Sequence, residues 1–196
     1  MDNITVTAEV ENGRQAEMER KYEEKLKEIK MPVPNDRLAL LASYLKGGAA
    51  LDLACGLGGN SLYLARLGYR VSAIDLSDTA IQYVQEQAKS YMLPIHAEVF
   101  DLTEYESLPF DEDSFELVVI TNYLDRSLFP YVKSWVKKGG FVFIETFFNS
   151  PELQSQRMSK KFCLNSNELL EEFKGWKVLS FEENEHEGRQ MIFCQK

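Results

Sequence analysis

The sequence contains few residues of the kinds that bind metal ions or form disulfide bonds. Its 196 residues include two histidines and three cysteines, and the cysteines, Cys55, Cys163 and Cys194, are odd in number and far apart. Neither residue type shows the paired spacing of a metal site, so we expect no metal. Scattered cysteines are typical of a reducing compartment, and we predict that the protein is cytoplasmic.

Long apolar runs and an excess of positive charge are also missing. The longest apolar runs, such as 117–120, are far shorter than the roughly 20 residues needed to cross a bilayer. Residues 1–20 are polar and lack the apolar core of a signal peptide. The formal net charge is -9, whereas proteins that bind nucleic acids usually carry a basic face. These absences predict no membrane association and no nucleic-acid partner, and nothing in the sequence indicates an oligomeric state.

The composition is that of a globular protein with a sizeable core, since 44% of the residues are hydrophobic and 12% are aromatic. We expect residues 1–16 to be poorly ordered and residues 17–196 to form one domain. Four apolar residues recur at helical spacing ahead of Pro32 and predict an amphipathic helix. They are Met18, Tyr22, Leu26 and Ile29.

Strand-like and helix-like segments alternate along most of the remaining chain. The predicted strands cover 49–54, 70–75, 95–100, 116–121 and 141–147, and the predicted helices cover 36–45, 60–67, 78–91 and 124–136. This alternation predicts an α/β fold with a parallel, doubly wound sheet and helices on both faces. Ser77 is expected to cap the helix that follows it, and the glycines 139–140 to break the chain before the fifth strand. A polar loop, a helix over 167–173 and strands over 177–185 and 190–195 complete the pattern.

The most informative segment is a strand, a glycine-rich turn and a helix that begin at residue 49. This succession places backbone N–H groups and a helix N-terminus beside a nucleotide-like ligand. Asp75 ends the next strand, 19 residues after Gly56 and 17 after Gly58. In nucleotide-binding α/β folds, an acid at about this distance holds ribose hydroxyls. The third glycine of a dinucleotide site would fall at Ser61, so the turn is of another kind.

Ligands of open α/β sheets bind at the carboxyl ends of the strands. This rule selects Asp75 for a ribose diol, and the structural alternative is an acid that caps the following helix. The rule also selects Asp101, which either faces an adenine amino group or is a solvated strand-end aspartate. Cys55 lies inside the turn, but no histidine is near it in the sequence, so we do not assign it as a nucleophile.

The order acid-x-Ala-Cys-Gly-x-Gly-Gly, which begins at Asp52, resembles motif I of the class I S-adenosylmethionine-dependent methyltransferases. Asp52, Gly56 and Gly58 match that motif, and Ala54 stands where its first glycine usually lies. Further stretches resemble the tellurite-resistance-type small-molecule methyltransferases, at 101–110, at 121–126, and at 162–164 followed by 168–176. The resemblance implies a Rossmann-like, doubly wound sheet that is mostly parallel with an antiparallel last strand. It also implies S-adenosyl-L-methionine as the cofactor.

The resemblance and the rule for open sheets together predict the cofactor-binding residues. Leu76 and Leu102 are expected to pack against adenine, while Asp52 supports the glycine turn or meets the ligand through water. The full set is Asp52, Ala54, Cys55, Gly56, Gly58, Gly59, Asp75, Leu76, Asp101, Leu102, Thr121 and Asn122. A sulfonium methyl donor is already activated, so we assign no catalytic acid or base.

The methyl acceptor is expected beside the end of the fourth strand and under the loop after the fifth. We predict Tyr123, Arg126 and Arg157 as substrate-binding residues, because guanidinium groups pair well with oxyanions. Charged helix faces and a solvated loop are the structural alternatives. The Asn/Asp-Pro-Pro-aromatic signature of methyltransferases that act on amino groups of bases or glutamine is absent at 121–124. We therefore predict direct methyl transfer to a small molecule, with an RNA or protein methyltransferase and a non-catalytic regulatory module as alternatives.

Overall fold

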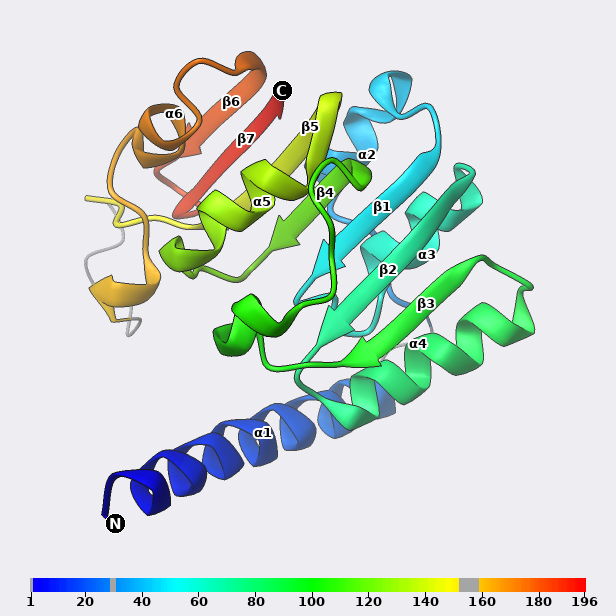
Figure 1. Ribbon diagram of the computed structural model, residues 1–196, viewed down its shortest axis with the longest axis vertical. Helices are drawn as coiled ribbons and strands as arrows, with labels where there is room; N and C mark the ends of the chain where they lie inside the picture. Colours follow the sequence, from blue (N-terminus) through cyan, green and yellow to red (C-terminus); the bar gives the residue numbers. More distant parts are fainter. Residues whose placement is uncertain (1, 29–30, 152–158) are drawn as a thin grey trace.

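The computed structural model describes residues 2–28, 31–151 and 159–196, which build one seven-stranded sheet (Figure 1). The strands lie in the order β3-β2-β1-β4-β5-β7-β6. β1 to β5 run parallel, and β7 lies antiparallel between β5 and β6. This confirms the Rossmann-like sheet with an antiparallel last strand. The strands are β1 (Gly48–Leu53), β2 (Tyr69–Asp75), β3 (Ile95–Val99), β4 (Phe115–Thr121), β5 (Val136–Phe147), β6 (Lys177–Asn184) and β7 (Arg189–Gln195).

The central strands are buried on both faces, which explains their unbroken apolar runs. In β4, Leu117 and Val119 join one core cluster together with Ala50 of β1. Val118 and Ile120, the residues that alternate with them, join a second cluster. Because successive side chains of a strand point to opposite faces, one apolar run fills both cores.

Helices cover both faces of the sheet, as the alternating pattern predicts (Figure 1). One core cluster receives side chains from α2, α3 and α4, and the other from α5 and α6. The Ser77 hydroxyl accepts a hydrogen bond from the Ala80 N–H at 3.1 Å, which confirms the predicted cap of α4. The helices are α2 (Asp36–Leu40), α3 (Gly59–Arg66), α4 (Asp78–Ser90), α5 (Phe129–Trp135) and α6 (Glu168–Glu172).

Two segments differ from the predicted pattern. The helix expected over 124–136 is divided, because Asp125 accepts a hydrogen bond from the Ser127 N–H at 2.9 Å and caps a separate short turn before α5. The glycines 139–140 do not break the chain before the fifth strand but lie inside β5. A Cβ at Gly140 would stand 2.9 Å from the Lys137 carbonyl oxygen, so a glycine is needed where the pairing with β4 shifts register.

A long N-terminal helix, α1 (Asp2–Glu28), passes the carboxyl ends of β2 and β3 (Figure 1). It contains the predicted helix from Met18 onward and extends toward the N-terminus into the segment 1–16. Ile29 lies outside the described residues. No helix in the described part of the chain combines the length and hydropathy needed to span a membrane.

The side chain of Glu19 attaches α1 to the N-terminus of α4. Its carboxylate accepts hydrogen bonds from the Asp78 N–H at 2.6 Å and from the Thr79 N–H at 3.1 Å. The first N–H groups of a helix have no partner inside that helix, and a negative charge there is stabilising. Glu19 thus caps α4 and fixes α1 at the edge of the sheet where β2 ends.

Candidate active site

The glycine-rich turn after β1 needs small residues at several positions. Gly58 has φ of 75° and caps α3, and a Cβ there would stand 2.7 Å from the Val84 side chain. A Cβ at Gly59 would stand 2.1 Å from the Val33 carbonyl oxygen. Ala54 also has a left-handed φ, of 55°, which a glycine adopts more easily. Ala54, which stands in place of the first glycine of the motif, is therefore held in a strained backbone conformation.

Asp75 links the turn after β1 to the turn after β2. Its Oδ2 accepts a hydrogen bond from the Gly56 N–H at 2.8 Å, and its Oδ1 accepts one from the Ser77 N–H at 3.1 Å. The Tyr22 hydroxyl of α1 donates to the same carboxylate over a longer distance, 3.5 Å. The side chain is buried, and this burial raises the pKa of Asp75 while the hydrogen bonds oppose the rise. The capping role was the alternative for Asp75, but the first N–H groups of α4 donate to Glu19 and Ser77 instead.

Asp52, in β1, contacts the helix that follows the glycine turn. Its Oδ2 accepts a hydrogen bond from the Ser61 hydroxyl of α3 at 2.5 Å, and its Oδ1 is buried without a partner among the described residues. Complete burial raises the pKa of Asp52 to about 7. Asp52 does not line the cavities described below, which fits a supporting role better than direct contact with a ligand.

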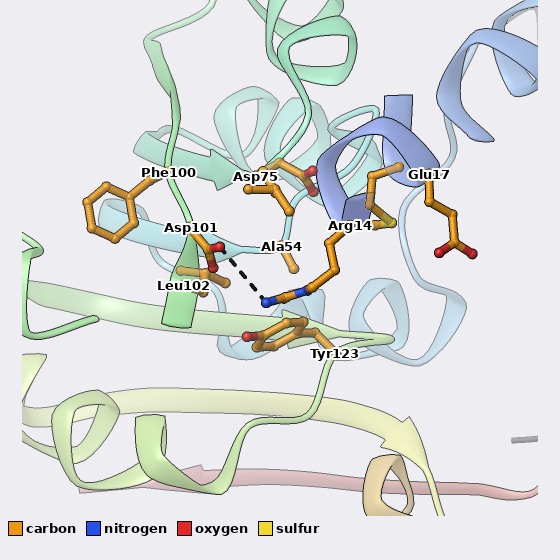
Figure 2. A pocket seen from close by; sticks show the side chains of 10 residues that line it. Arg14, Glu17, Ala54, Asp75, Phe100, Asp101, Leu102 and Tyr123 are labelled. Atoms are coloured by element: carbon orange, nitrogen blue, oxygen red, sulfur yellow. Dashed lines mark ion pairs between the residues drawn. The ribbon is translucent and has the colours of Figure 1, made fainter. Parts of the chain in front are cut away.

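A first cavity, of about 230 Å³, opens at the ends of β2 and β3. Leu76, Leu102 and Phe100 line it. Asp75 and Asp101 supply carboxylates (Figure 2). Figure 2 shows the Arg14 side chain of α1 reaching into this cavity toward Asp101, with its Nη1 3.9 Å from Oδ2. The other carboxylate oxygen of Asp101 accepts hydrogen bonds from Thr103. An apolar slot between two acids has the chemistry to hold adenine and a ribose.

A second cavity, of about 670 Å³, lies over the glycine turn. The Asn60 amide nitrogen donates to the Thr121 hydroxyl at 3.1 Å and so joins the start of α3 to the end of β4. α1 closes the opposite side of this cavity. The predicted residues Ala54, Cys55, Gly56, Gly59, Asp75, Thr121 and Asn122 line it together with Lys21, Tyr22 and Lys25 of α1.

A third cavity, of about 950 Å³, extends from the end of β4 toward α6. Tyr123, Phe147 and Phe162 give it aromatic walls. Met18 and Tyr123 line all three cavities, so the three spaces meet at these side chains. Burial and the nearby Asp125 raise the pKa of Tyr123, which keeps the phenol neutral.

The predicted substrate-binding arginines have different places. Arg126 lines the third cavity, but its guanidinium donates to the Glu168 carboxylate at 2.5 and 3.0 Å and to the Cys163 carbonyl oxygen at 2.9 Å. It therefore already fixes the loop before α6. Arg157 lies outside the described residues. Burial and the acids around it raise the pKa of the Cys55 thiol, which agrees with leaving Cys55 without a nucleophilic role.

Sequence reasoning missed the side chains that other elements bring to the site. α1 supplies Arg14, Met18 and Tyr22, and helical spacing indicated the helix but not where it packs. Arg189 of β7 donates to the Asn122 Oδ1 at 2.6 Å, and its guanidinium lies 3.8 Å from the centre of the Phe147 ring. Arg189 thereby orients two residues of the cavity walls. Within the described ranges, no group of three or more His, Cys, Asp or Glu side chains could hold a metal ion.

The strand order, the glycine turn after β1 and the acid at the end of β2 define the class I S-adenosylmethionine-dependent methyltransferase fold. Within that class, the model of the family described as tellurite resistance protein TehB matches residues 15–191. The chain belongs to this family.

Relatives and solved structures agree with this assignment. A probable S-adenosyl-L-methionine-dependent methyltransferase TehB of Haemophilus influenzae is 29% identical over 138 residues, which are 68% of this chain and 48% of the relative. This chain therefore spans about half the length of that relative. Phosphoethanolamine N-methyltransferase 1 of Arabidopsis thaliana is 31% identical over 120 residues, 58% of this chain and 24% of that protein. The crystal structure of TehB from Haemophilus influenzae has a TM-score of 0.73 at 24% identity and covers 83% of this chain and 62% of that chain.

Proposed function

We propose that this protein is an S-adenosyl-L-methionine-dependent methyltransferase that acts on a small molecule by direct methyl transfer. The observation that carries the proposal is the Asp75 carboxylate bonded to the Gly56 N–H at 2.8 Å, at the point where the first two cavities meet. Residues 17–196 would form the methyltransferase domain. Three free cysteines are compatible with work in the cytoplasm.

The residues around the first two cavities fit the proposed cofactor. Leu76 and Leu102 would pack against adenine, with Asp101 near its amino group, and Asp75 would accept hydrogen bonds from the ribose diol. A carboxylate has about four lone-pair positions, and two of those on Asp75 are taken by close backbone N–H groups. The 3.5 Å contact from Tyr22 is the weakest of its hydrogen bonds and the one a ribose hydroxyl would replace.

The glycine turn would accept the remaining part of the cofactor. Gly56 and Gly59 line the second cavity without side chains, which leaves room for a ligand beside the N-terminus of α3. Ala54, Cys55, Thr121 and Asn122 would complete the contacts from the two strand ends. When bound, the cofactor supplies an activated methyl group, so the chain has to align the acceptor and exclude water.

The third cavity would receive the acceptor, with Tyr123, Arg126 and Arg157 as its proposed contacts. Aromatic walls and a guanidinium suit a small, partly apolar or anionic molecule. Burial raises the pKa of Tyr123, so its phenol stays protonated near neutral pH. We expect an acceptor that is nucleophilic without deprotonation, such as a small thiolate or a chalcogen oxyanion. The name of the Arabidopsis relative, a phosphoethanolamine methyltransferase, also supports a small polar acceptor.

Charge and cavity shape disfavour the two alternative functions. The net charge of -9 disfavours a nucleic-acid acceptor. A non-catalytic module would need only the first two cavities, and the open third cavity beside them favours an enzyme.

Transfer of a labelled methyl group tests the proposal directly. The purified chain is incubated with methyl-labelled S-adenosyl-L-methionine and, separately, with small thiols, chalcogen oxyanions, phosphoethanolamine, RNA and protein. Label in a small molecule is the expected result. Label only in RNA or protein would identify the first alternative. Tight binding of the cofactor without transfer to any of these acceptors would support the regulatory module.

A further inference from the structure

Two lysines of α1 line the second cavity. Lys21 and Lys25 share its walls with Gly56 and Asn60. They are one helical turn apart, so they lie on the same side of α1. The helix is fixed in this position by the contact of Glu19 with the N-terminus of α4.

The aromatic ring of Tyr22 lies close to both ammonium groups. The Nζ atom of Lys21 is 5.7 Å from the ring centre, and that of Lys25 is 5.6 Å from it. Tyr22 itself is buried against Leu57 and Ala80. A fixed ring therefore holds two positive charges near the mouth of the cavity.

Neither lysine forms a close ion pair in the described part of the chain, although the charge of Asp75 acts on both from a longer distance. No carboxylate oxygen lies within 4.0 Å of the Nζ atom of Lys21 or Lys25 there, whereas Lys133 and Lys137 each pair with a glutamate. Burial and the neighbouring Lys21 lower the pKa of Lys25, and the negative charge of Asp75 opposes this only in part. A carboxylate placed between the two ammonium groups would relieve their mutual repulsion.

We propose that Lys21 and Lys25 bind the carboxylate of the amino-acid end of the cofactor. This inference rests on the proposed function, because it takes the first cavity as the adenine site and Asp75 as the ribose contact. The amino-acid end of S-adenosyl-L-methionine is opposite to its adenine and carries a carboxylate. The second cavity is the next space beyond Asp75 and Gly56, and the two lysines are the cations that line it.

A comparison of two ligands separates this role from a general effect on binding. S-adenosyl-L-homocysteine carries the amino-acid end, whereas 5′-methylthioadenosine has the same nucleoside and a thioether without it. Dissociation constants for both ligands are measured by calorimetry on the full chain and on the double variant Lys21→Met, Lys25→Met. Methionine keeps an unbranched side chain and a similar helix propensity, so α1 should persist. Lys27→Met is the matched control, since Lys27 is an exposed residue of α1 that lines none of the three cavities.

The expected result is a loss of affinity for S-adenosyl-L-homocysteine of about fivefold in the double variant, the size of a partly exposed ion pair. Affinity for 5′-methylthioadenosine should stay within about twofold of that of the wild type, and Lys27→Met should change neither. The variant Lys21→Arg, Lys25→Arg should keep most of the discrimination between the ligands. Equal losses for both ligands, or no loss for either, would overturn the inference while leaving the proposed function standing. Wild-type protein that binds neither ligand would refute both.

Discussion

The ribose contact of Asp75 can be tested with a nearly isosteric change, Asp75→Asn. The amide has the shape of the carboxylate, but it offers one acceptor oxygen instead of two. That oxygen can face either the Gly56 N–H or the Ser77 N–H, which both donate to Asp75 in the wild type. The other N–H group then meets an amide nitrogen that also donates. The variant should therefore lose cofactor affinity and some stability together.

The size of the expected losses in cofactor affinity and stability follows from the number of hydrogen bonds that change. A hydrogen bond to a charged group contributes roughly 1.5–3 kcal/mol, and the ribose diol can make two such bonds to the carboxylate. Loss of one of them predicts at least about a tenfold rise in the dissociation constant, which corresponds to about 1.4 kcal/mol. One lost backbone contact predicts a fall in the free energy of unfolding of similar size. Asp75 is only 2% exposed, so water cannot replace the lost partner.

Calorimetric titration with S-adenosyl-L-homocysteine, well below the melting temperature of the variant, measures the effect on affinity. Asp111→Asn is the control, because Asp111 is an exposed acid that lines none of the three cavities. It should bind the ligand as the wild type does. An unchanged dissociation constant for folded Asp75→Asn would show that the carboxylate only joins the two turns. The ribose assignment would then be refuted.

Three further predictions concern the turn and the third cavity. Ala54→Gly should raise the melting temperature, because Ala54 has φ of 55° and a left-handed conformation costs an alanine roughly 1 kcal/mol; a lower melting temperature would mean that the strain is absent. Arg126→Ala should slow turnover while cofactor affinity stays within about twofold, because it releases Glu168 and the loop before α6; parent-level turnover on every accepted substrate would contradict this. Burial raises the pKa of Asp52 from 3.8 to about 7. The folded protein therefore favours the protonated carboxyl, and the stability that this gives is complete below pH 3.8 and is lost as the pH rises through about 7. In thermal melts between pH 5 and 7, the wild type should therefore lose stability relative to Asp52→Asn by up to about 1.4 kcal/mol per pH unit, and parallel curves would rule out this titration.

The sequence predicted the parts of the fold that depend on local pattern. The run from β1 through the glycine turn to α3 was placed to within one residue at each end, because burial, the glycines and the helix start lie next to each other in the chain. The cap of α4 at Ser77 was predicted for the same reason. In contrast, the glycines 139–140 look like a chain break in isolation. They lie at the register shift of β5 against β4, and their hydrogen bonds to Lys196, the residue after β7, keep them inside the strand.

The parts of the site that escaped prediction depend on contacts between distant segments. Arg126 looked like a free cation because its partner Glu168 is 42 residues away. Arg189 lies 67 residues from Asn122 and gave no motif of its own. Periodicity reports which face of an element is buried, but it does not report which polar groups tertiary packing will bring together. The candidate site is therefore best predicted where one strand and its turn supply it, and worst where a second element closes it.

The helix α1 has a larger part in the site than its sequence suggests. One stretch of this helix contacts the sheet edge through Tyr22 and Asp75, which are 53 residues apart, and contacts α4 through Glu19. Its Met18 borders all three cavities. A ligand that fills the first two cavities has to touch both the sheet edge and α1, and it will stabilise whichever arrangement of the two it contacts best. Binding at the glycine turn and the docking of α1 are thus linked through the same side chains, although the motif that identifies the turn lies entirely outside the helix.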